Sequence, residues 1–146
     1  MDRHAKQTSK SQPDGYTIHH MEFLNPSKTF PFSDAVIYSG RILETVITGI
    51  PDGAHDPVPG GVLAELAEIF RQLDEVLAKA GVTKTAVVSV RLYLADVIGE
   101  IAAVNEKYRE YFGGHPPNRR AYGVTLQRGM RIEAAFTAEL PPTAIL

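Results

Sequence analysis

Two arginines and a glutamate near the C-terminal end carry the most distinctive chemistry in this 146-residue sequence. Arg119 and Arg120 follow a Pro-rich segment at the start of a predicted strand, and Glu133 lies on a second strand beyond a turn at residues 127–129. An arginine there can bind a carboxylate through paired hydrogen bonds. Desolvation can raise the pKa of a glutamate among apolar neighbours, which suits proton transfer near neutral pH. These residues indicate a site for a small anionic substrate; the alternative is half-exposed residues in surface ion pairs.

The overall composition is that of one soluble globular domain. A hydrophobic fraction of 44% and a charged fraction of 22% are ordinary values, and the length suffices for a core. The net charge of −2 provides neither a basic footprint for nucleic acid nor a polybasic patch for a membrane. The absence of cysteine excludes disulfides, thiolate catalysis and zinc sites built on cysteine.

Neither a metal site nor a targeting segment is predicted. The five histidines are scattered and do not pair at the spacing of a known metal motif, so we expect no metal. The N-terminus lacks the apolar core of a signal peptide, and no apolar run approaches the length of a membrane span. We therefore expect a cytoplasmic protein.

The chain divides into a short extension and a single domain. Residues 1–14 are polar and predict a flexible N-terminal extension, and residues 15–146 form the domain. Alternating or β-branched segments predict strands at residues 16–23, the end of 30–38, 42–48, 85–94, the segment after residue 118, and 131–140. A turn is expected at residues 25–28. Within the strand at 85–94, the alternation places Val88, Val90, Leu92 and Leu94 on one face.

Two segments have the apolar spacing of helices. The first, at residues 61–80, has Gly81 in position to end it. The second, at residues 97–112, carries Asn105 beside its apolar stripe, where it could bond a loop or lie at the edge of a pocket.

The predicted order is β-β-β-α-β-α-β-β, an α+β two-layer sandwich. Two helices with one apolar stripe each should cover one face of a mostly antiparallel or mixed sheet. The other face mixes Ser89, Arg91, Glu133 and Thr137 with valines and alanines. Such a face is too apolar for water and too polar for a core, so it predicts a subunit interface. Gly49, where the strand at 42–48 ends, could allow a ligand or another backbone to approach closely, or could simply end the strand.

Several short motifs occur in one order along the chain. They lie at residues 31–36, 48–51, 86–96, 102–112, 117–119 and 132–133. In order and spacing they are similar to the Pro-Tyr-Ser-x-Ala-Val, Ser-Gly-Gln-Ile-Pro, strand, helix, Pro-x-Arg and Ile-Glu motifs of one family. The sequence therefore resembles the RidA/YjgF (reactive intermediate deaminase) family from about residue 30 to residue 139.

The resemblance implies a fold, an assembly and an activity. The fold is chorismate-mutase-like, and the assembly is a homotrimer with active sites in the clefts between subunits. The implied activity is hydrolysis of 2-aminoacrylate-type enamines, or their imine tautomers, to 2-keto acids and ammonia, without a cofactor.

Site roles follow by position from the same resemblance. Arg119 would bind the substrate carboxylate, and Glu133 would orient or activate water. Asn105 corresponds to a helix asparagine near the family's site, and backbone groups near Gly49 and Ala121 would line the pocket.

This sequence departs from the family at some of these positions. Phe32 replaces a common tyrosine, Ala121 replaces a cysteine, and Ile50 directly follows Gly49 where the family has a glutamine between them. These changes make the predicted pocket more apolar. Three alternatives stay open: a non-catalytic trimer that binds small carboxylates, a pathway-specific deaminase of the 2-aminomuconate type, and an RNA-directed role, against which the net charge argues.

Overall fold

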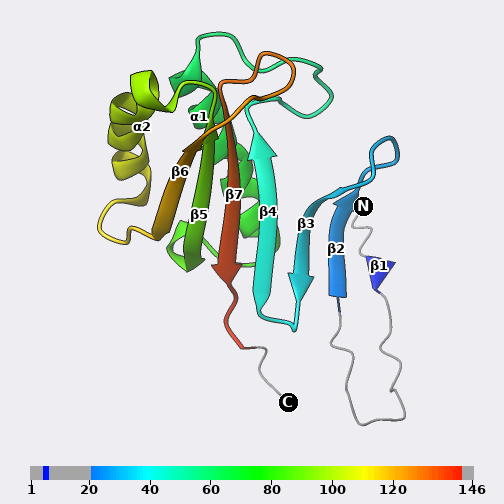
Figure 1. Cartoon of the computed structure of the whole chain (residues 1–146). Coiled ribbons are helices and arrows are strands. Elements are labelled where there is room, and N and C mark those ends of the chain that lie inside the picture. The colour runs from blue at the N-terminus through cyan, green and yellow to red at the C-terminus, as the bar shows by residue number, and fades with distance from the viewer. Residues whose placement is uncertain (1–4, 7–20, 143–146) are drawn as a thin grey trace, which may run out of the picture.

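A computed structural model of the protein describes residues 5–6 and 21–142. Its strands form one seven-stranded sheet in the order β1-β2-β3-β4-β7-β5-β6 (Figure 1). Only β5 and β6 run parallel, and every other neighbouring pair is antiparallel. The strands are β1 (Ala5–Lys6), β2 (Met21–Pro26), β3 (Ser33–Tyr38), β4 (Ile42–Thr48), β5 (Val87–Leu94), β6 (Asn118–Gly123) and β7 (Ile132–Glu139).

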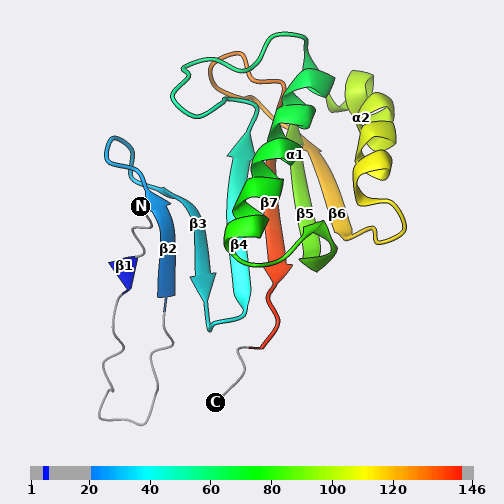
Figure 2. The same cartoon turned by 180° about the vertical axis from the view of Figure 1, so that it is seen from behind.

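Both helices cover the same face of the sheet (Figure 2). Helix α1 (Val62–Lys79) ends before Gly81, whose φ of 79° gives the left-handed turn expected after a helix. Helix α2 (Val97–Phe112) begins after Asp96, whose carboxylate accepts a hydrogen bond from the Gly99 N–H at 3.0 Å. Within the described part of the chain, neither helix is long and apolar enough to cross a bilayer.

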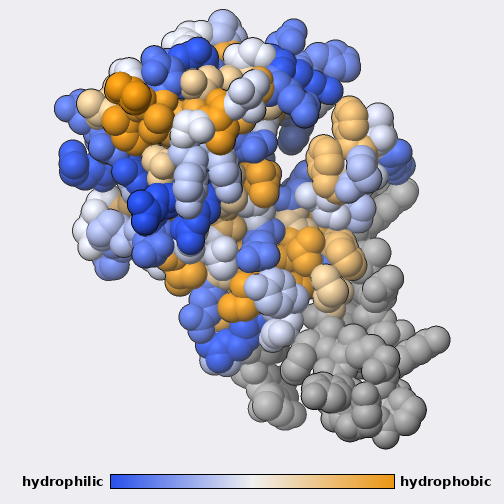
Figure 3. All heavy atoms as spheres, in the orientation of Figure 1, coloured by the Kyte–Doolittle hydropathy of each residue, from blue (hydrophilic) through white to orange (hydrophobic). Residues whose placement is uncertain are grey.

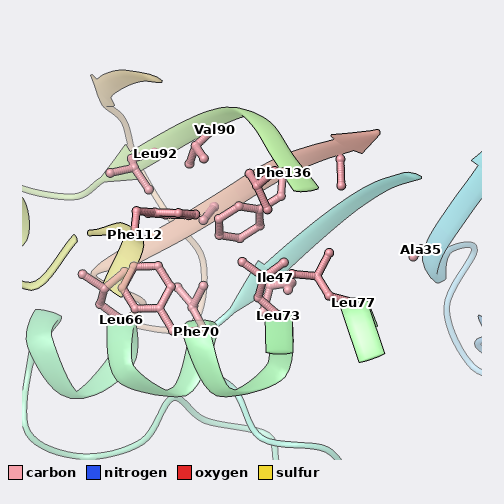
Figure 4. Packing of buried hydrophobic residues seen from close by; sticks show 14 of the residues in the cluster. Ala35, Ile47, Leu66, Phe70, Leu73, Leu77, Val90, Leu92, Phe112 and Phe136 are labelled. Carbon is pink, nitrogen blue, oxygen red and sulfur yellow. The ribbon is translucent and has the colours of Figure 1, made fainter. Parts of the chain in front are cut away.

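The core lies between the helices and the sheet (Figure 4). Leu66 and Leu73 of α1 lie at helical spacing and are fully buried. They face alternate residues of the strands, among them Leu92 of β5 and Phe136 of β7. Burying each such side chain contributes roughly 1.5–3 kcal/mol, so these contacts fix α1 and α2 against the central strands.

The predicted α+β architecture is confirmed, with one additional short strand. Ala5–Lys6 pair with β2 as β1, although they fall inside the predicted extension. The rest of that extension and the first part of the predicted strand at 16–23 lie outside the described residues, so the flexibility of residues 1–14 stays a prediction. Strand β2 also continues to Pro26, through the start of the predicted turn, because Leu24 and Pro26 pair with β3.

The prediction for Val88 is wrong. Strand β5 shifts its register between Val87 and Ser89, which is the pattern of a β-bulge. The extra residue turns Val87 into the core and leaves Val88 46% exposed. Residues 84–86, expected as the start of this strand, form a 3-10 turn instead.

The face of the sheet away from the helices, here called the open face, is mixed as predicted. Ser89, Arg91, Glu133 and Thr137 lie on it half-buried, while Val46 of β4 is 61% exposed. Figure 3 shows apolar and polar residues side by side on this face. Its role as a subunit interface stays a prediction.

Candidate active site

Arg119 lies on the helix side of the sheet, in a hollow here called the Arg119 pocket. Strand β6 pairs Arg119 with the buried Val90 of β5, so both side chains point toward α2. The Arg119 guanidinium lies over the ring of Tyr108, 4.8 Å from its centroid. The pocket has a volume of about 560 Å³ and is lined by Asn105, Tyr108, Arg109, Phe112, Gly113, Pro116, Pro117 and Arg119.

Two polar atoms in the Arg119 pocket are buried without a partner among the described residues. They are Oδ1 of Asn105 and the hydroxyl of Tyr108. Burial raises the pKa of Tyr108 to about 12, against the opposing charge of Arg119, so the hydroxyl stays protonated. Arg119 itself has no carboxylate partner among the described residues. A cation and two unsatisfied polar atoms in one hollow form a site suited to a small anion with polar groups.

Glu133 lies on the open face, in a second hollow here called the Glu133 cavity. Strand β7 pairs it with Thr48 of β4 on one side and Tyr93 of β5 on the other. Burial raises the pKa of Glu133 above its ordinary value of 4.5, and no charged group offsets this effect. Its carboxylate has no hydrogen bond or ion pair within the described chain. It is therefore a partly desolvated base available to a ligand or to water.

Phe32 borders the Glu133 cavity. Its side chain is 61% exposed and stacks in parallel on Phe30, with the ring centroids 5.6 Å apart. The Ser27 N–H donates to the Phe32 carbonyl at 2.8 Å, which fixes this loop. Figure 3 shows the hollow between the loop and the rest of the molecule. The two rings give the cavity an aromatic wall.

Gly49 allows a close approach, and the approaching group is helix α1. A Cβ at this position would lie 2.6 Å from Cβ and 2.9 Å from Cα of Glu65. Such contacts are too short, so only glycine fits beneath the helix. Nearby, Gln72 of α1 donates to the carbonyls of Thr48 at 3.2 Å and Ile50 at 3.0 Å. Helix α1 thus holds the turn that follows β4 against the Glu133 cavity.

Ala121 lies on the helix side of β6, two residues beyond Arg119. It pairs with Leu92 and packs against the core. Arg120 lies between these two residues on the opposite face and is exposed. The alternation of β6 therefore separates the two arginines, and only Arg119 reaches the pocket near α2.

A single chain assembles the predicted site in two halves. Arg119 and Asn105 come together in the Arg119 pocket, with Ala121 on the same side of the sheet. Glu133 and Phe32 come together in the Glu133 cavity. The expectation from sequence that Arg119 and Glu133 act together is not met within one chain, because they lie on opposite faces of the sheet with β5 between their strands.

Residues with visible contacts to these halves were not among the predicted site residues. Tyr108 carries the Arg119 guanidinium, Gln72 holds the turn after β4, and Arg128 lies over the Phe30 ring at 5.7 Å. For Tyr108 a signal existed, because it follows Asn105 by three positions and therefore lies on the same helix face. The contacts of Gln72 and Arg128 are long-range and leave no comparable pattern.

Comparisons with known proteins agree on one family. The sequence model described as Endoribonuclease L-PSP matches residues 24–140. The 2-iminobutanoate/2-iminopropanoate deaminase of Rattus norvegicus is 38% identical over 80% of this chain and 85% of its own length. The Homo sapiens protein of the same name is 36% identical over 77% of this chain and 82% of its own.

Solved structures extend the likeness to the fold. The Rid family protein YyfA from Yersinia pestis, whose function is described as unknown, is 28% identical, with a TM-score of 0.71 over 79% of this chain and 92% of its own. Yeast Mmf1, at 22% identity and a TM-score of 0.70, covers 80% of this chain and 92% of its own and supports the fold alone. With the helix-covered sheet and the ordered motifs, these matches establish that the chain belongs to the RidA/YjgF family, whose sequence model is described as Endoribonuclease L-PSP.

Proposed function

We propose that the protein is an imine and enamine deaminase that hydrolyses 2-aminoacrylate-type compounds to 2-keto acids and ammonia. The names of its relatives from rat and man support this reaction class. The observation that carries the proposal is a pair of unsatisfied charges. Arg119 has no acidic partner, and Glu133 has no basic one, within the described residues.

Arg119 binds the substrate carboxylate. Its planar guanidinium can donate two parallel hydrogen bonds to a carboxylate, which fixes both the position and the orientation of the substrate. The amide of Asn105 lies in the same pocket and can bond a further polar atom of the ligand. This binding places the imine carbon for attack by water.

Glu133 moves the protons. An enamine first takes a proton at its terminal carbon to become the imine. Water then adds to the imine carbon while Glu133 accepts a proton from it, and the nitrogen becomes an amine. Glu133 returns the proton to this nitrogen, the carbon–nitrogen bond breaks, and ammonia leaves the 2-keto acid. The atoms balance with water as the only co-reactant, so the reaction needs no cofactor and no metal.

The complete site requires two copies of the chain. Because Arg119 and Glu133 point away from opposite faces of one sheet, Arg119 of one copy joins Glu133 of a neighbouring copy. The open face, with Val46 exposed and Glu133 half-buried, supplies a surface for this contact. A homotrimer with three such clefts fits the proposal, and a cytoplasmic location stays an expectation.

A larger substrate is the second candidate, favoured by the aromatic wall of the Glu133 cavity. Phe30 and Phe32 stack there, and Phe32 brings no hydroxyl to the cavity. Such a wall suits a longer unsaturated enamine of the 2-aminomuconate type. Rates for short and long enamines measured side by side distinguish the two candidates.

An RNA-directed activity, which the description of the family model names, has less support in this chain. The net charge of −2 gives no electrostatic footprint for a polyanion. Salt-sensitive RNA binding would restore this alternative. A non-catalytic carboxylate-binding trimer would show 2-keto acid binding without turnover.

The test compares 2-keto acid release from 2-aminoacrylate and 2-iminobutyrate generated in situ. Wild type accelerates release, and Arg119→Ala lowers kcat/KM by roughly 100-fold or more, since two charge-assisted hydrogen bonds are lost. Arg120→Ala is the matched control, because Arg120 lies next in the chain but on the other face of β6. No acceleration by wild type, or equal losses in both variants, would contradict the proposal.

A further inference from the structure

Arg119 needs an external support to hold its geometry. Strand β6 is an edge strand that pairs only with β5. The guanidinium has no side-chain hydrogen bond among the described residues. A free arginine side chain holds about 2 kcal/mol of rotamer entropy, which binding of a carboxylate would have to overcome. Its recorded directional contact is the ring of Tyr108, 4.8 Å away.

Tyr108 is rigid enough to provide that support. It is only 7% exposed and lies in the last two turns of α2. Its ring packs against Phe112 with the centroids 4.6 Å apart and against Phe70 of α1 at 6.4 Å. The ring is therefore fixed by both helices, and a side chain lying over it inherits that fixed position.

We propose that Tyr108 is the positioning residue for Arg119, an inference that rests on the proposed function of Arg119. The negative face of the ring attracts the guanidinium, with an energy of about 0.5–2 kcal/mol depending on desolvation. Lying over the ring face leaves the N–H groups at the guanidinium edge free to bind a carboxylate. Tyr108 acts through Arg119 and does not itself touch the substrate.

The ring, and not the hydroxyl, carries this role. The hydroxyl is buried and has no hydrogen-bond partner among the described residues, so its removal breaks no bond there. Phenylalanine keeps a ring face for the guanidinium, whereas leucine or methionine removes it. Tyr108→Phe should therefore preserve what Tyr108→Leu loses.

Tyr111 offers a matched control on the same helix. Its ring stacks on Phe70 at 3.9 Å, and its hydroxyl donates to Asp74 at 2.5 Å. It packs in the same aromatic cluster but does not carry Arg119 and does not line the Arg119 pocket. Tyr111→Leu thus reports the cost of a lost tyrosine without the loss of the support.

The experiment measures KM and kcat for 2-iminobutyrate and calorimetric binding of 2-oxobutanoate in the assembled full-length protein. Tyr108→Leu should raise KM and the dissociation constant by roughly 3–30-fold, with a smaller change in kcat. Tyr108→Phe should recover both values to within about twofold. Tyr111→Leu should lower the melting temperature without the change in KM. Tyr108→Met, which keeps bulk without a ring, replaces the leucine variant if that variant does not fold.

The outcomes separate this inference from the proposed function. Unchanged KM and binding in Tyr108→Leu or Tyr108→Met, while Arg119→Ala is impaired, overturns the inference alone. A loss in Tyr108→Phe equal to that in Tyr108→Leu also overturns it, because the hydroxyl would then act directly. Wild type that binds 2-oxobutanoate without turnover removes the deaminase but still tests Tyr108 by binding. Wild type that does neither overturns both.

Discussion

The Arg119 pocket and the Glu133 cavity are opposites in charge, in support and in position. The pocket holds a cation on an aromatic ring between α2 and β6. The cavity holds a partly desolvated carboxylate between β4, β7 and the loop that carries Phe32. The two hollows lie on opposite faces of the same sheet.

The difference shows that each half is built for one task. The pocket positions a carboxylate but has no base, and the cavity supplies a base but has no cation. Neither half can bind and convert an imino acid alone. The account therefore predicts separable losses: binding fails when the pocket is damaged, and turnover fails when the cavity is damaged.

The largest effect expected from the cavity is that of Glu133→Gln. Removing a general base lowers kcat by roughly 100- to 10,000-fold. Binding of 2-oxobutanoate should change little, because the carboxylate contact belongs to Arg119. Steady-state rates and calorimetry measure the two quantities, and Arg119→Ala should show the reverse pattern. Equal loss of binding in both variants would erase the distinction between the halves.

The same residue sets the pH dependence. Glu133 must be ionised to accept a proton, so activity falls as the pH drops through its pKa. Burial raises that pKa, which places the acidic limb of kcat/KM above pH 4.5. Glu133→Gln should lack this limb in its residual rate. An unchanged limb in the variant would assign the titration to another group.

The next effect concerns the contact beneath the Glu133 cavity. Gly49→Ala adds a methyl group 2.6 Å from Cβ of Glu65, so α1 must move. We expect a loss of about 1–3 kcal/mol in the free energy of unfolding. Gly114→Ala is the control, since an added Cβ there meets nothing within 4 Å. Thermal unfolding checks both, and equal melting temperatures would show that α1 does not depend on this contact.

A smaller effect distinguishes two glutamates of α1 by the sign of their pH dependence. Burial raises the pKa of Glu65, which is 2% exposed and accepts a hydrogen bond from the Arg131 N–H at 2.8 Å. Its contribution to stability is present below pH 4.5 and is lost as pH rises through the raised pKa. The hydrogen bond from Arg71 lowers the pKa of Glu68, so its contribution is present above pH 4.5 and is lost in acid.

Melting temperatures of the two glutamine variants at pH 4 and pH 7 test this contrast. Relative to wild type, Glu65→Gln should gain a few degrees between pH 4 and pH 7. Glu68→Gln should lose a smaller amount over the same range, since its ion pair with Arg71 is exposed to solvent. Shifts of the same sign in both variants would contradict the burial of the Glu65 charge.

The elements with strong periodicity were predictable from sequence. The apolar stripe of α1, with Gly81 after it, and the alternation of β7 each specify their structure locally. Val88 was mispredicted because a β-bulge adds one residue without any change in composition, and the bulge reverses the face that follows.

The relation between site residues could not be predicted because it depends on long-range pairing. The alternation of β6 separates Arg119 from Arg120 by face, but only the pairing of Arg119 with Val90 shows which face meets α2. The contact between Gly49 and Glu65 likewise joins two elements distant in the sequence. The residue types indicated the chemistry, while the sheet topology determined that one chain holds it in two halves.

Subunit complementation tests the central claim, that the two halves meet between copies of the chain. Arg119→Ala and Glu133→Gln are each inactive and are mixed in equal amounts under conditions that exchange subunits. Half of the copies then carry an intact Arg119 and the other half an intact Glu133. Since each cleft draws one residue from each neighbour, roughly a quarter of wild-type activity should return. Arg119→Ala mixed with the double variant is the control and should stay inactive. If the first mixture also stays inactive after proven exchange, the two residues do not meet between subunits and the account is wrong.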